Sequence, residues 1–394
     1  MMYHWKEDVY KMKKQISVLC ILIILVCTLF LSGSIDKRMR FYGEVMIGVE
    51  HVGQVPEQFK KIVENNVFQG VSAFDGKLLK QDSFSEDEEN GIITHQVWMM
   101  DIYGKELASY TCNSEDTYHI TTLTATDDGG FLFTLGFEDH SYGDDVWASD
   151  KGFASRVIKC DSKGNLQFDT PLDGVNGGAL EICYEKNGQF YLFGQIQTPE
   201  TKIRGVYSQT DIYMTILDKD GKVLKSRYIA GSDFDNLKVA EMSDDRFILS
   251  IYSQSDDGDF AGSDSGGYPV DWVITVNDNL EIIEKKKESG RDFFDYMIGE
   301  KDGVPVHRSD AAPDDFYAGS LHAFIDYGDF YLLVSTKRTG RYENQPPMFS
   351  HIWYYCETVY SAYDYNDNLI FRTSVDSSPD YDAMSKKYNH VDAE

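Results

Sequence analysis

The 394-residue sequence contains none of the short motifs that mark common catalytic sites. It has no G-x-S-x-G around a serine nucleophile, no glycine-rich phosphate loop and no H-E-x-x-H zinc motif. Its six cysteines include no C-x-x-C pair, which argues against a zinc site. Four of them lie in apolar, strand-like runs, where we expect buried free thiols: Cys112, Cys160, Cys183 and Cys356. Motifs therefore assign no catalytic residue and no resident cofactor.

Positive charge is scarce. The chain has 37 Lys and Arg against 65 Asp and Glu, a formal net charge of −28. Seven of the basic and three of the acidic residues fall in the first 40 positions, which leaves 30 positive and 62 negative groups, a net of −32, in the remainder. Phosphate backbones would repel so acidic a body, so we expect no nucleic-acid partner.

Charge is absent altogether between Gln15 and Ile35, and residues 16–31 are almost entirely aliphatic. With residues 32–35 included, a helix here is long enough to cross a bilayer. Basic residues before it place residues 1–15 in the cytoplasm and the C-terminal body outside the cell membrane. The alternative for residues 16–35 is a signal peptide cleaved near Ser32–Ser34, which would make the protein secreted.

Beyond this segment, two kinds of strand recur with a common period. The first kind is an aromatic strand after a Gly/Asp turn, as in DDGGFLFTLGF (127–137), and its anchors are 59, 57 and 83 residues apart. The second kind is an apolar strand closed by an acidic or amide turn, and its anchors are 60, 57, 59 and 87 residues apart. The first anchors are Phe131, Phe190, Phe247 and Phe330. The second are Asp101, Asp161, Asp218, Asn277 and Asp364.

Both series lengthen at the same place, which indicates one insertion of about 25 residues within 288–316. Each period holds four short strands, in the first full unit at 119–126, 130–137, 154–160 and 164–170. Sheets of this size bury their faces only by stacking on their neighbours, and radial stacking gives a propeller.

We therefore predict an all-β fold: a β-propeller of four-stranded antiparallel blades over residues 41–374, with five blades favoured and six as the alternative. Residues 44–50 and 67–74 are candidate strands of the first blade, and 56–66 a short helix. We expect mobile surface at 81–90 and in the acidic tail, 375–394.

The units resemble the long-period β-propeller repeats of bacterial secreted or membrane-anchored surface proteins over about residues 94–374. That family has a DGG-type turn, an S-x-DGD-x-x-G loop and a strand that ends in K-h-D-x-x-G, where h is apolar. The loop is matched by Ser255, Asp257, Gly258, Asp259 and Gly262, and HSYGDDVWASDKG (140–152) is a looser copy of it. The strand end is matched by Lys159, Asp161 and Gly164. Asn277 replaces the aspartate of this pattern in a later unit.

The acidic loop SDDGDFAGSD (255–264) has two interpretations. Asp and Gly are the residues that exposed turns prefer, and this turn chemistry is the interpretation we favour. The alternative is a calcium loop, because clustered carboxylates supply the oxygen ligands that calcium needs. Its ligands would be Asp256, Asp257, Asp259 and Asp264.

The first strand of each unit should lie nearest the propeller axis. These strands carry five isolated polar residues that do not fall at equivalent positions: His119, Glu181, Glu241, His322 and Asp326. We expect a membrane-tethered, extracytoplasmic, non-catalytic binding or scaffolding domain at the cell surface, whose partner is an unknown extracellular protein or glycan. The alternative is a glycan-active hydrolase or lyase with a pair of channel carboxylates.

Overall fold

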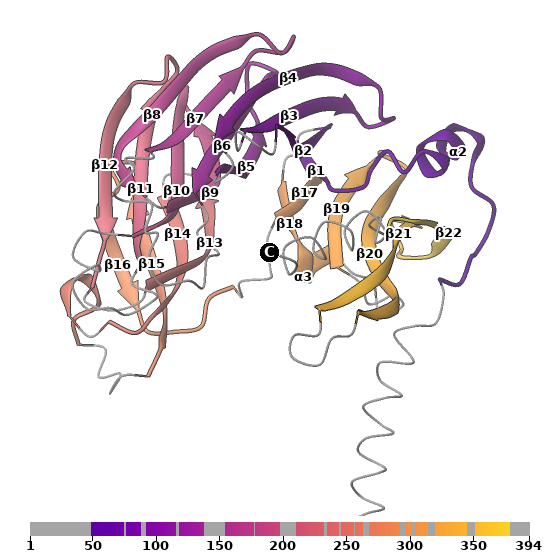
Figure 1. The fold of residues 1–394 in the computed structure, drawn as a ribbon. Coiled ribbons are helices and arrows are strands. Elements are labelled where there is room, and N and C mark those ends of the chain that lie inside the picture. Colours follow the sequence, from indigo (N-terminus) through magenta and orange to yellow (C-terminus); the bar gives the residue numbers. More distant parts are fainter. Residues whose placement is uncertain are drawn as a thin grey trace, which may run out of the picture. The chain divides into compact units, whose positions relative to one another are not determined.

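The computed structural model consists largely of β-strands (Figure 1). It describes residues 49–74, 76–87, 92–115, 118–137, 154–176, 178–197, 210–231, 235–243, 246–255, 257–262, 268–291, 297–301, 304–311, 313, 320–344 and 351–378. The chain forms two compact units. The larger comprises His51–Ser335 and Val359–Thr373, and the smaller Met1–Glu50, Thr336–Thr358 and Ser374–Glu394.

In the described part of the chain, five antiparallel sheets of four strands follow one another, and within each sheet the strands lie in sequence order. The first contains β1 (Val71–Phe74), β2 (Lys77–Asp87), β3 (Ile92–Asp101) and β4 (Glu106–Glu115). The second contains β5 (Tyr118–Ala125), β6 (Phe131–Phe137), β7 (Ala154–Cys160) and β8 (Leu166–Asn176). The third contains β9 (Gly178–Lys186), β10 (Gln189–Gln197), β11 (Thr210–Asp218) and β12 (Val223–Ile229). The fourth contains β13 (Asp235–Ser243), β14 (Arg246–Ser253), β15 (Val270–Asn277) and β16 (Ile282–Lys286). The last contains β19 (Ser320–Asp326), β20 (Phe330–Asn344), β21 (His351–Asp364) and β22 (Leu369–Asp376).

The predicted all-β class, the four-stranded antiparallel sheets and the equivalence of the aromatic anchors are confirmed. The four anchoring phenylalanines all lie at the start of the second strand of their sheets, on β6, β10, β14 and β20. The strands predicted for the first full unit match β5 to β8 to within a few residues, except that β8 continues to Asn176.

The turn after the third strand of each sheet is built in the same way five times. The side-chain Oδ1 of Asp161 accepts hydrogen bonds from the backbone N–H groups two and four residues later, at 2.8 and 2.9 Å. Equivalent pairs of bonds occur at Asp101, Asp218, Asn277 and Asp364. Asn277 replaces aspartate without loss because its amide oxygen accepts the same two bonds.

The fourth position of these turns has positive φ. Glycine supplies it in three sheets, with φ of 83° at Gly164, whereas Leu280 at 57° and Asp367 at 61° adopt it in the other two. The D-x-x-G pattern thus encodes a hydrogen-bonded hairpin turn, which explains its recurrence without reference to a ligand.

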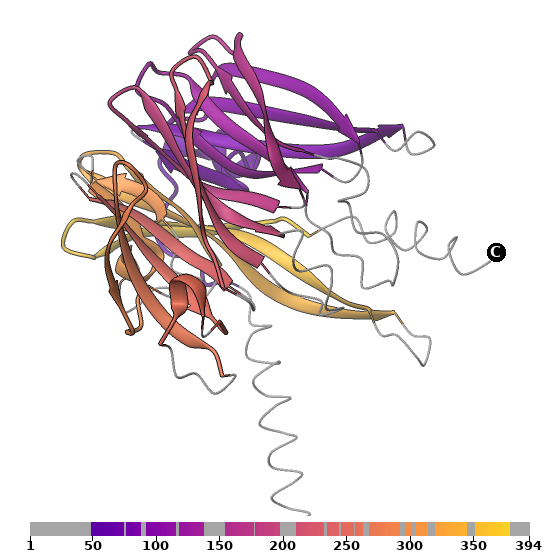
Figure 2. The ribbon, with the colours of Figure 1, turned by 90° about the vertical axis from the view of Figure 1, so that its left-hand side faces the viewer.

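The second strand of each inner sheet is apolar at successive positions because both of its faces are buried. Phe131 and Phe133 on β6 pack into a core shared with the first sheet, whereas Leu132 between them packs against the third sheet. Likewise, Leu192 on β10 faces the second sheet and Phe193 the fourth. Figure 2 shows the second and third sheets lying side by side.

The last sheet meets the N-terminal part of the larger unit. Helix α2 (Glu57–Glu64), which confirms the predicted helix, packs Phe59 against Phe330 and Phe371, with ring centroids 5.8 and 6.1 Å apart. Val52 and Arg372 form an antiparallel bridge with backbone hydrogen bonds of 3.0 and 2.9 Å. Strand β1 of the first sheet also contacts β19 of the last.

The residues predicted as an insertion contain a small sheet of their own. Strands β17 (Met297–Lys301) and β18 (Val304–His307) pair with each other, and a single turn of helix, α3 (Arg308–Ala311), follows. Strand β17 contacts β19 of the last sheet and β1 of the first. The predicted insertion therefore contains a two-stranded sheet, which the sequence analysis did not predict.

The prediction of mobile surface at 81–90 was wrong for residues 81–87, because β2 runs to Asp87 and pairs with β3 along its length, and residues 88–90 lie outside the described residues. The four cysteines beyond the N-terminal segment are free thiols as predicted, two of them buried and two partly buried. Residues 1–48, including the predicted membrane segment at 16–35, and 379–394 of the acidic tail lie outside the described residues. No helix in the described part of the chain is both long and apolar enough to cross a membrane.

Candidate functional site

The acidic loop after β14 holds the connection between the third and fourth sheets. Its 3₁₀ helix, η3 (Gly258–Phe260), presents Asp259 to Ala230: the Asp259 amide donates to the Ala230 carbonyl at 2.9 Å, and the Ala230 amide donates to Asp259 Oδ2 at 3.1 Å. Gly258 has φ of 56°, and a Cβ there would lie 2.4 Å from the Ala230 oxygen. Phe260 is fully buried against Trp272. These contacts hold the loop against the backbone of residues 230–231, which lie between the third and fourth sheets.

The buried carboxyl of Asp235 lies next to this loop. Ser253 and Ser255 both donate side-chain hydrogen bonds to Asp235, at 2.5 and 3.2 Å, and all three residues are fully buried. Burial raises the pKa of Asp235 to about 7, although the bonds from the two serines oppose the shift. The serine of the S-x-DGD pattern thus contacts a core carboxyl.

Of the four predicted calcium ligands, Asp257 and Asp259 belong to the described residues, whereas Asp256 and Asp264 do not. The carboxylate of Asp259 is directed to the Ala230 amide and lies 3.9 Å from the Arg227 guanidinium. In the described part of the chain, no group of three His, Cys, Asp or Glu side chains is arranged to hold a metal ion. Calcium binding stays a prediction.

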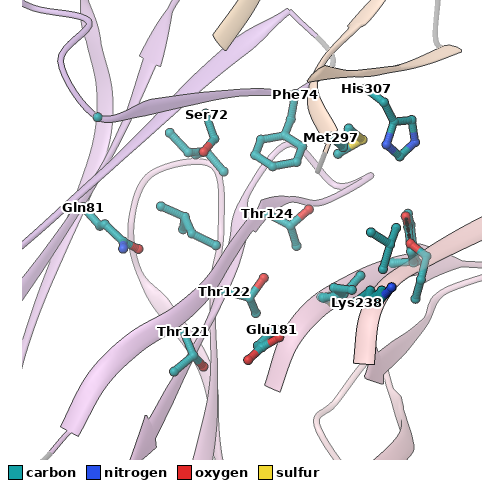
Figure 3. A pocket seen from close by; sticks show the side chains of 18 residues that line it. Ser72, Phe74, Gln81, Thr121, Thr122, Thr124, Glu181, Lys238, Met297 and His307 are labelled. Carbon is teal, nitrogen blue, oxygen red and sulfur yellow. Dashed lines mark hydrogen bonds between the residues drawn. The ribbon is translucent and has the colours of Figure 1, made fainter. Parts of the chain in front are cut away.

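A cavity of about 420 Å³ lies where the first strands of successive sheets converge (Figure 3). Residues from β1, β2, β5, β9, β13, β17 and β18 line it. Strand alternation determines which side chains reach it: Ser72 and Phe74 of β1 face the cavity, whereas Val71 and Ala73 pack into the core.

The polar lining consists mainly of hydroxyl and amide groups. Ser72, Gln81, Thr122 and Thr124 surround the space, and Thr121 adds a hydroxyl that bonds to Thr134 at 2.7 Å and to a backbone carbonyl. These groups both donate and accept hydrogen bonds, so they suit a polar ligand.

Two charged side chains, Glu181 of β9 and Lys238 of β13, also line the cavity. Lys238 is neutralised within its own sheet: its Nζ lies 2.6 Å from Asp271 Oδ1 and 5.2 Å from the centroid of the Tyr252 ring. Glu181 is half-buried, and Figure 3 shows it opposite Phe74 across the space.

The cysteine and tyrosine of β9 are held in their neutral forms. Burial raises the pKa of both Cys183 and Tyr184, and the Tyr184 hydroxyl donates to the Ala240 carbonyl at 2.8 Å. A thiol with a raised pKa is a poor nucleophile near neutral pH.

Beside the cavity, an ionic cluster joins the fourth sheet to the two-stranded sheet. Glu241 of β13 pairs with Arg291, and the Nε2 of the buried His307 lies 3.6 Å from the same carboxylate. Arg291 also contacts Asp310 of α3 at 3.3 Å. This cluster bridges two sheets that are consecutive around the cavity.

Of the five polar residues predicted for the axis-facing strands, Glu181 alone lines this cavity. Glu241 lies in the ionic cluster, and Asp326 accepts hydrogen bonds from the Gly328 amide and the Tyr365 hydroxyl. His119 lies close to the buried His95, and burial lowers the pKa of His322. The sequence prediction missed Lys238 and His307; the strand position of Lys238, three residues after the start of a first strand, was the available signal.

No protein-family model matches the sequence, and no curated protein matches it. Among solved structures, the chain is similar to a Synechocystis apocarotenoid oxygenase mutant, with 11% identity and a TM-score of 0.30 over 76% of this chain. It is also similar to the Kuenenia stuttgartiensis hydrazine synthase, with 8% identity and a TM-score of 0.32 over 62% of this chain. The chain spans 58% and 61% of those two proteins. Likenesses this weak transfer no activity or ligand.

Proposed function

We propose that the larger unit is a β-propeller of six sectors, five with four strands and one with two. Support comes from the contacts between sheets, which proceed from each sheet to the next. The fourth sheet contacts the two-stranded sheet through the ionic cluster at Glu241. The two-stranded sheet contacts the last sheet through β17 and β19. The contacts of β1 with β17 and β19 then close the series.

We infer that this propeller is a non-catalytic binding domain whose ligand occupies the cavity between the first strands. The observation that carries this inference is the chemistry of the lining: several hydroxyl and amide groups from different sheets surround about 420 Å³ of space, a volume typical of small-molecule sites. Converging polar groups on rigid strands position a ligand, whereas chemistry needs an acid, base or nucleophile in addition.

The second candidate is a glycan-active hydrolase or lyase, which needs two carboxyl groups on one substrate. Glu181 is the feature that favours it. Of the described residues that line the cavity, however, Glu181 is the one that carries a carboxylate, and the carboxylate of nearby Glu241 is paired with Arg291. The lining therefore supports binding better than hydrolysis.

The test is a thermal-shift screen of the purified domain against neutral mono- and disaccharides, amino acids, amines and small carboxylates. Hits are then compared between the wild type and Thr122→Val, which removes a hydroxyl from the cavity wall at nearly constant volume. A ligand that raises Tm in the wild type, raises it less in Thr122→Val and is recovered unchanged supports binding. Conversion of a bound glycan to products, lost in Glu181→Gln, would support the enzyme instead.

We further propose that the propeller is tethered to the outer face of the cell membrane by residues 16–35. The support is the uncharged, aliphatic stretch preceded by Lys11, Lys13 and Lys14. Protease treatment of intact cells should remove the propeller epitope while an N-terminal tag stays protected in the membrane fraction. A propeller epitope in the medium would indicate cleavage, and one protected inside the cell would refute export.

A further inference from the structure

A β-bulge adds one residue to the first strand of each of three consecutive sheets, and the added residue lines the cavity. The pairing of β5 with β6 shifts between Ile120 and Thr122, which leaves Thr121 as the extra residue. The corresponding shifts in β9 and β13 leave Glu181 and Lys238 as the extra residues. Bulges redirect side chains and are frequent beside functional sites. The cavity lining is therefore a repeated feature of the sheets, which supports its role as a site.

The ionisable side chains Lys238, His307 and Glu181 of this lining already interact within the protein. The ammonium of Lys238 lies 2.6 Å from Asp271 Oδ1, and the Nε2 of His307 lies 3.6 Å from the Glu241 carboxylate. Glu181 also has a partner within the chain. A charged ligand would have to compete with these partners and would lose part of its own hydration as well. The lining therefore favours a neutral ligand.

Three neutral polar groups of the lining are in the opposite situation. The side chains of Ser72, Gln81 and Thr122 make no hydrogen bond within the described part of the chain. Ser72 lies directly opposite Leu79 in the pairing of β1 with β2, so Gln81, two residues further along β2, lies on the same face of the first sheet. Thr122 belongs to the second sheet, and Figure 3 shows all three around the space. Hydroxyl and amide groups both donate and accept, so they suit a ligand that does the same.

One wall of the cavity is aromatic. Phe74 of β1 presents its ring to the space, and Met297 of β17 lies beside it (Figure 3). The face of an aromatic ring is slightly negative, and the C–H bonds of a sugar ring, which are polarised by the neighbouring oxygens, pack well on it. Hydroxyl partners on two sheets and an apolar ring together fit a ligand with a polar edge and an apolar face.

We propose that the cavity binds a neutral monosaccharide unit, with its hydroxyl groups bonded to Ser72, Gln81 and Thr122 and one face of its ring against Phe74. This inference rests on the proposed binding function and specifies its ligand class. The space of about 420 Å³ lies within the range of small-molecule sites and has room for a hexose.

The experiment measures binding of individual sugars by isothermal titration calorimetry and saturation-transfer NMR, at physiological salt and a mildly acidic pH. The neutral probes are glucose, galactose and mannose, and the charged probes are protonated glucosamine and glucuronate. The proteins are the wild type, Thr122→Val, Phe74→Leu and the matched control Thr111→Val, which removes a hydroxyl from an exposed position outside the lining. Circular dichroism and Tm show whether each variant is folded.

At least one neutral hexose should bind the wild type more tightly than either charged sugar does. That hexose should bind Thr111→Val as it binds the wild type. It should bind Thr122→Val and Phe74→Leu each about fivefold more weakly, because each variant loses one contact of ordinary strength. The comparison between probes uses the wild type alone, so it remains decisive even if a variant fails to fold.

Two results would refute the sugar while leaving the proposed binding function intact. One is tighter binding of glucosamine or glucuronate than of every neutral hexose. The other is no hexose binding together with a hit from another class in the thermal-shift screen. Equal hexose binding by all four proteins would place the sugar outside this lining and would also refute the inference. No hexose binding and no hit in the screen would remove the proposed function as well.

Discussion

The ammonium nitrogen of Lys159 lies 2.9 Å from both carboxylate oxygens of Asp128. The lysine side chain is 2% exposed and also donates to the Cys160 carbonyl at 2.8 Å, while Asp128 accepts further bonds from Thr126 and the Gly130 amide. The lysine belongs to the K-h-D strand end and the aspartate to the DDGG turn. The pair therefore joins two separate parts of the repeat pattern within one sheet.

Lys159→Met should lower the free energy of unfolding by about 3 kcal/mol, because it leaves a carboxylate and a buried carbonyl without their shared donor. The half-exposed side chain of Asp128 keeps the loss at the lower end of the range for buried pairs. Urea denaturation measures the effect. Lys163→Met, at an exposed position of the following turn, is the control, and equal effects of the two substitutions would refute the structural role.

The buried carboxyl of Asp235 should make stability depend on pH above 4. Its pKa is raised from 3.8 to about 7, so the folded protein holds a proton that the unfolded chain has released between these values. Its contribution is therefore greatest below pH 4 and falls by about 1.4 kcal/mol per pH unit as the pH rises to 7.

Asp235→Asn should remove this slope and make the protein more stable than the wild type above pH 7, since the amide is neutral and still accepts a bond from Ser253. Chemical denaturation from pH 4 to 8 measures the slope. Asp329→Asn, on an exposed turn, should leave it unchanged. Parallel pH profiles for the wild type and Asp235→Asn would contradict the assignment.

The parts of the fold that the sequence predicted are those determined by local chemistry. The five turns recur because each needs one side-chain acceptor and one positive φ; the acceptor is visible as Asp or Asn in all five, and the positive φ as Gly in three of them. The two-stranded sheet was missed because MIGEK and VPVH (297–307) have neither an aromatic second strand nor such a turn. The C-terminal part of strand β2 was missed because Asp82, Glu86 and Asp87 disfavour a strand, and pairing with β3 overrides that preference.

The lining of the cavity could not be predicted from any single repeat, because residues of several sheets form it. Glu181 and Lys238 occupy similar places on consecutive first strands, yet Lys238 turns to Asp271 on its own sheet. Both side chains line the cavity, and the ion pair that Lys238 makes depends on a residue of another strand, not on spacing along the chain. His307 lies on the reduced sheet, outside the repeat register altogether.

Gly164→Ala should be far more destabilising than Gly188→Ala. Both glycines have positive φ, 83° and 69°, so each substitution costs about 1 kcal/mol in backbone strain. A Cβ at Gly164 would also lie 2.2 Å from the backbone oxygen of Ser109 in the preceding sheet, whereas nothing lies within 4 Å of one at Gly188. Thermal unfolding of the two variants should separate the contributions. Similar Tm values would show that the contact between sheets at Gly164 relaxes at no cost.

Asp259→Ala tests the two interpretations of the acidic loop against each other. If the carboxylate serves the fold, its loss leaves the Ala230 amide without an acceptor and lowers the free energy of unfolding by about 1–2 kcal/mol. That loss should be the same in millimolar calcium and in EDTA, because no ion takes part. Asp257→Ala removes a carboxylate from the same loop and would damage a calcium site equally.

The wild type itself should therefore melt at the same temperature in calcium and in EDTA. The opposite pattern is distinctive: a Tm raised by calcium in the wild type, with the increase abolished by both Asp257→Ala and Asp259→Ala. That pattern would follow from binding to the native state alone, which stabilises in proportion to the logarithm of ligand concentration. It would support the calcium interpretation, in which Asp259 is an ion ligand as well as the acceptor for the Ala230 amide.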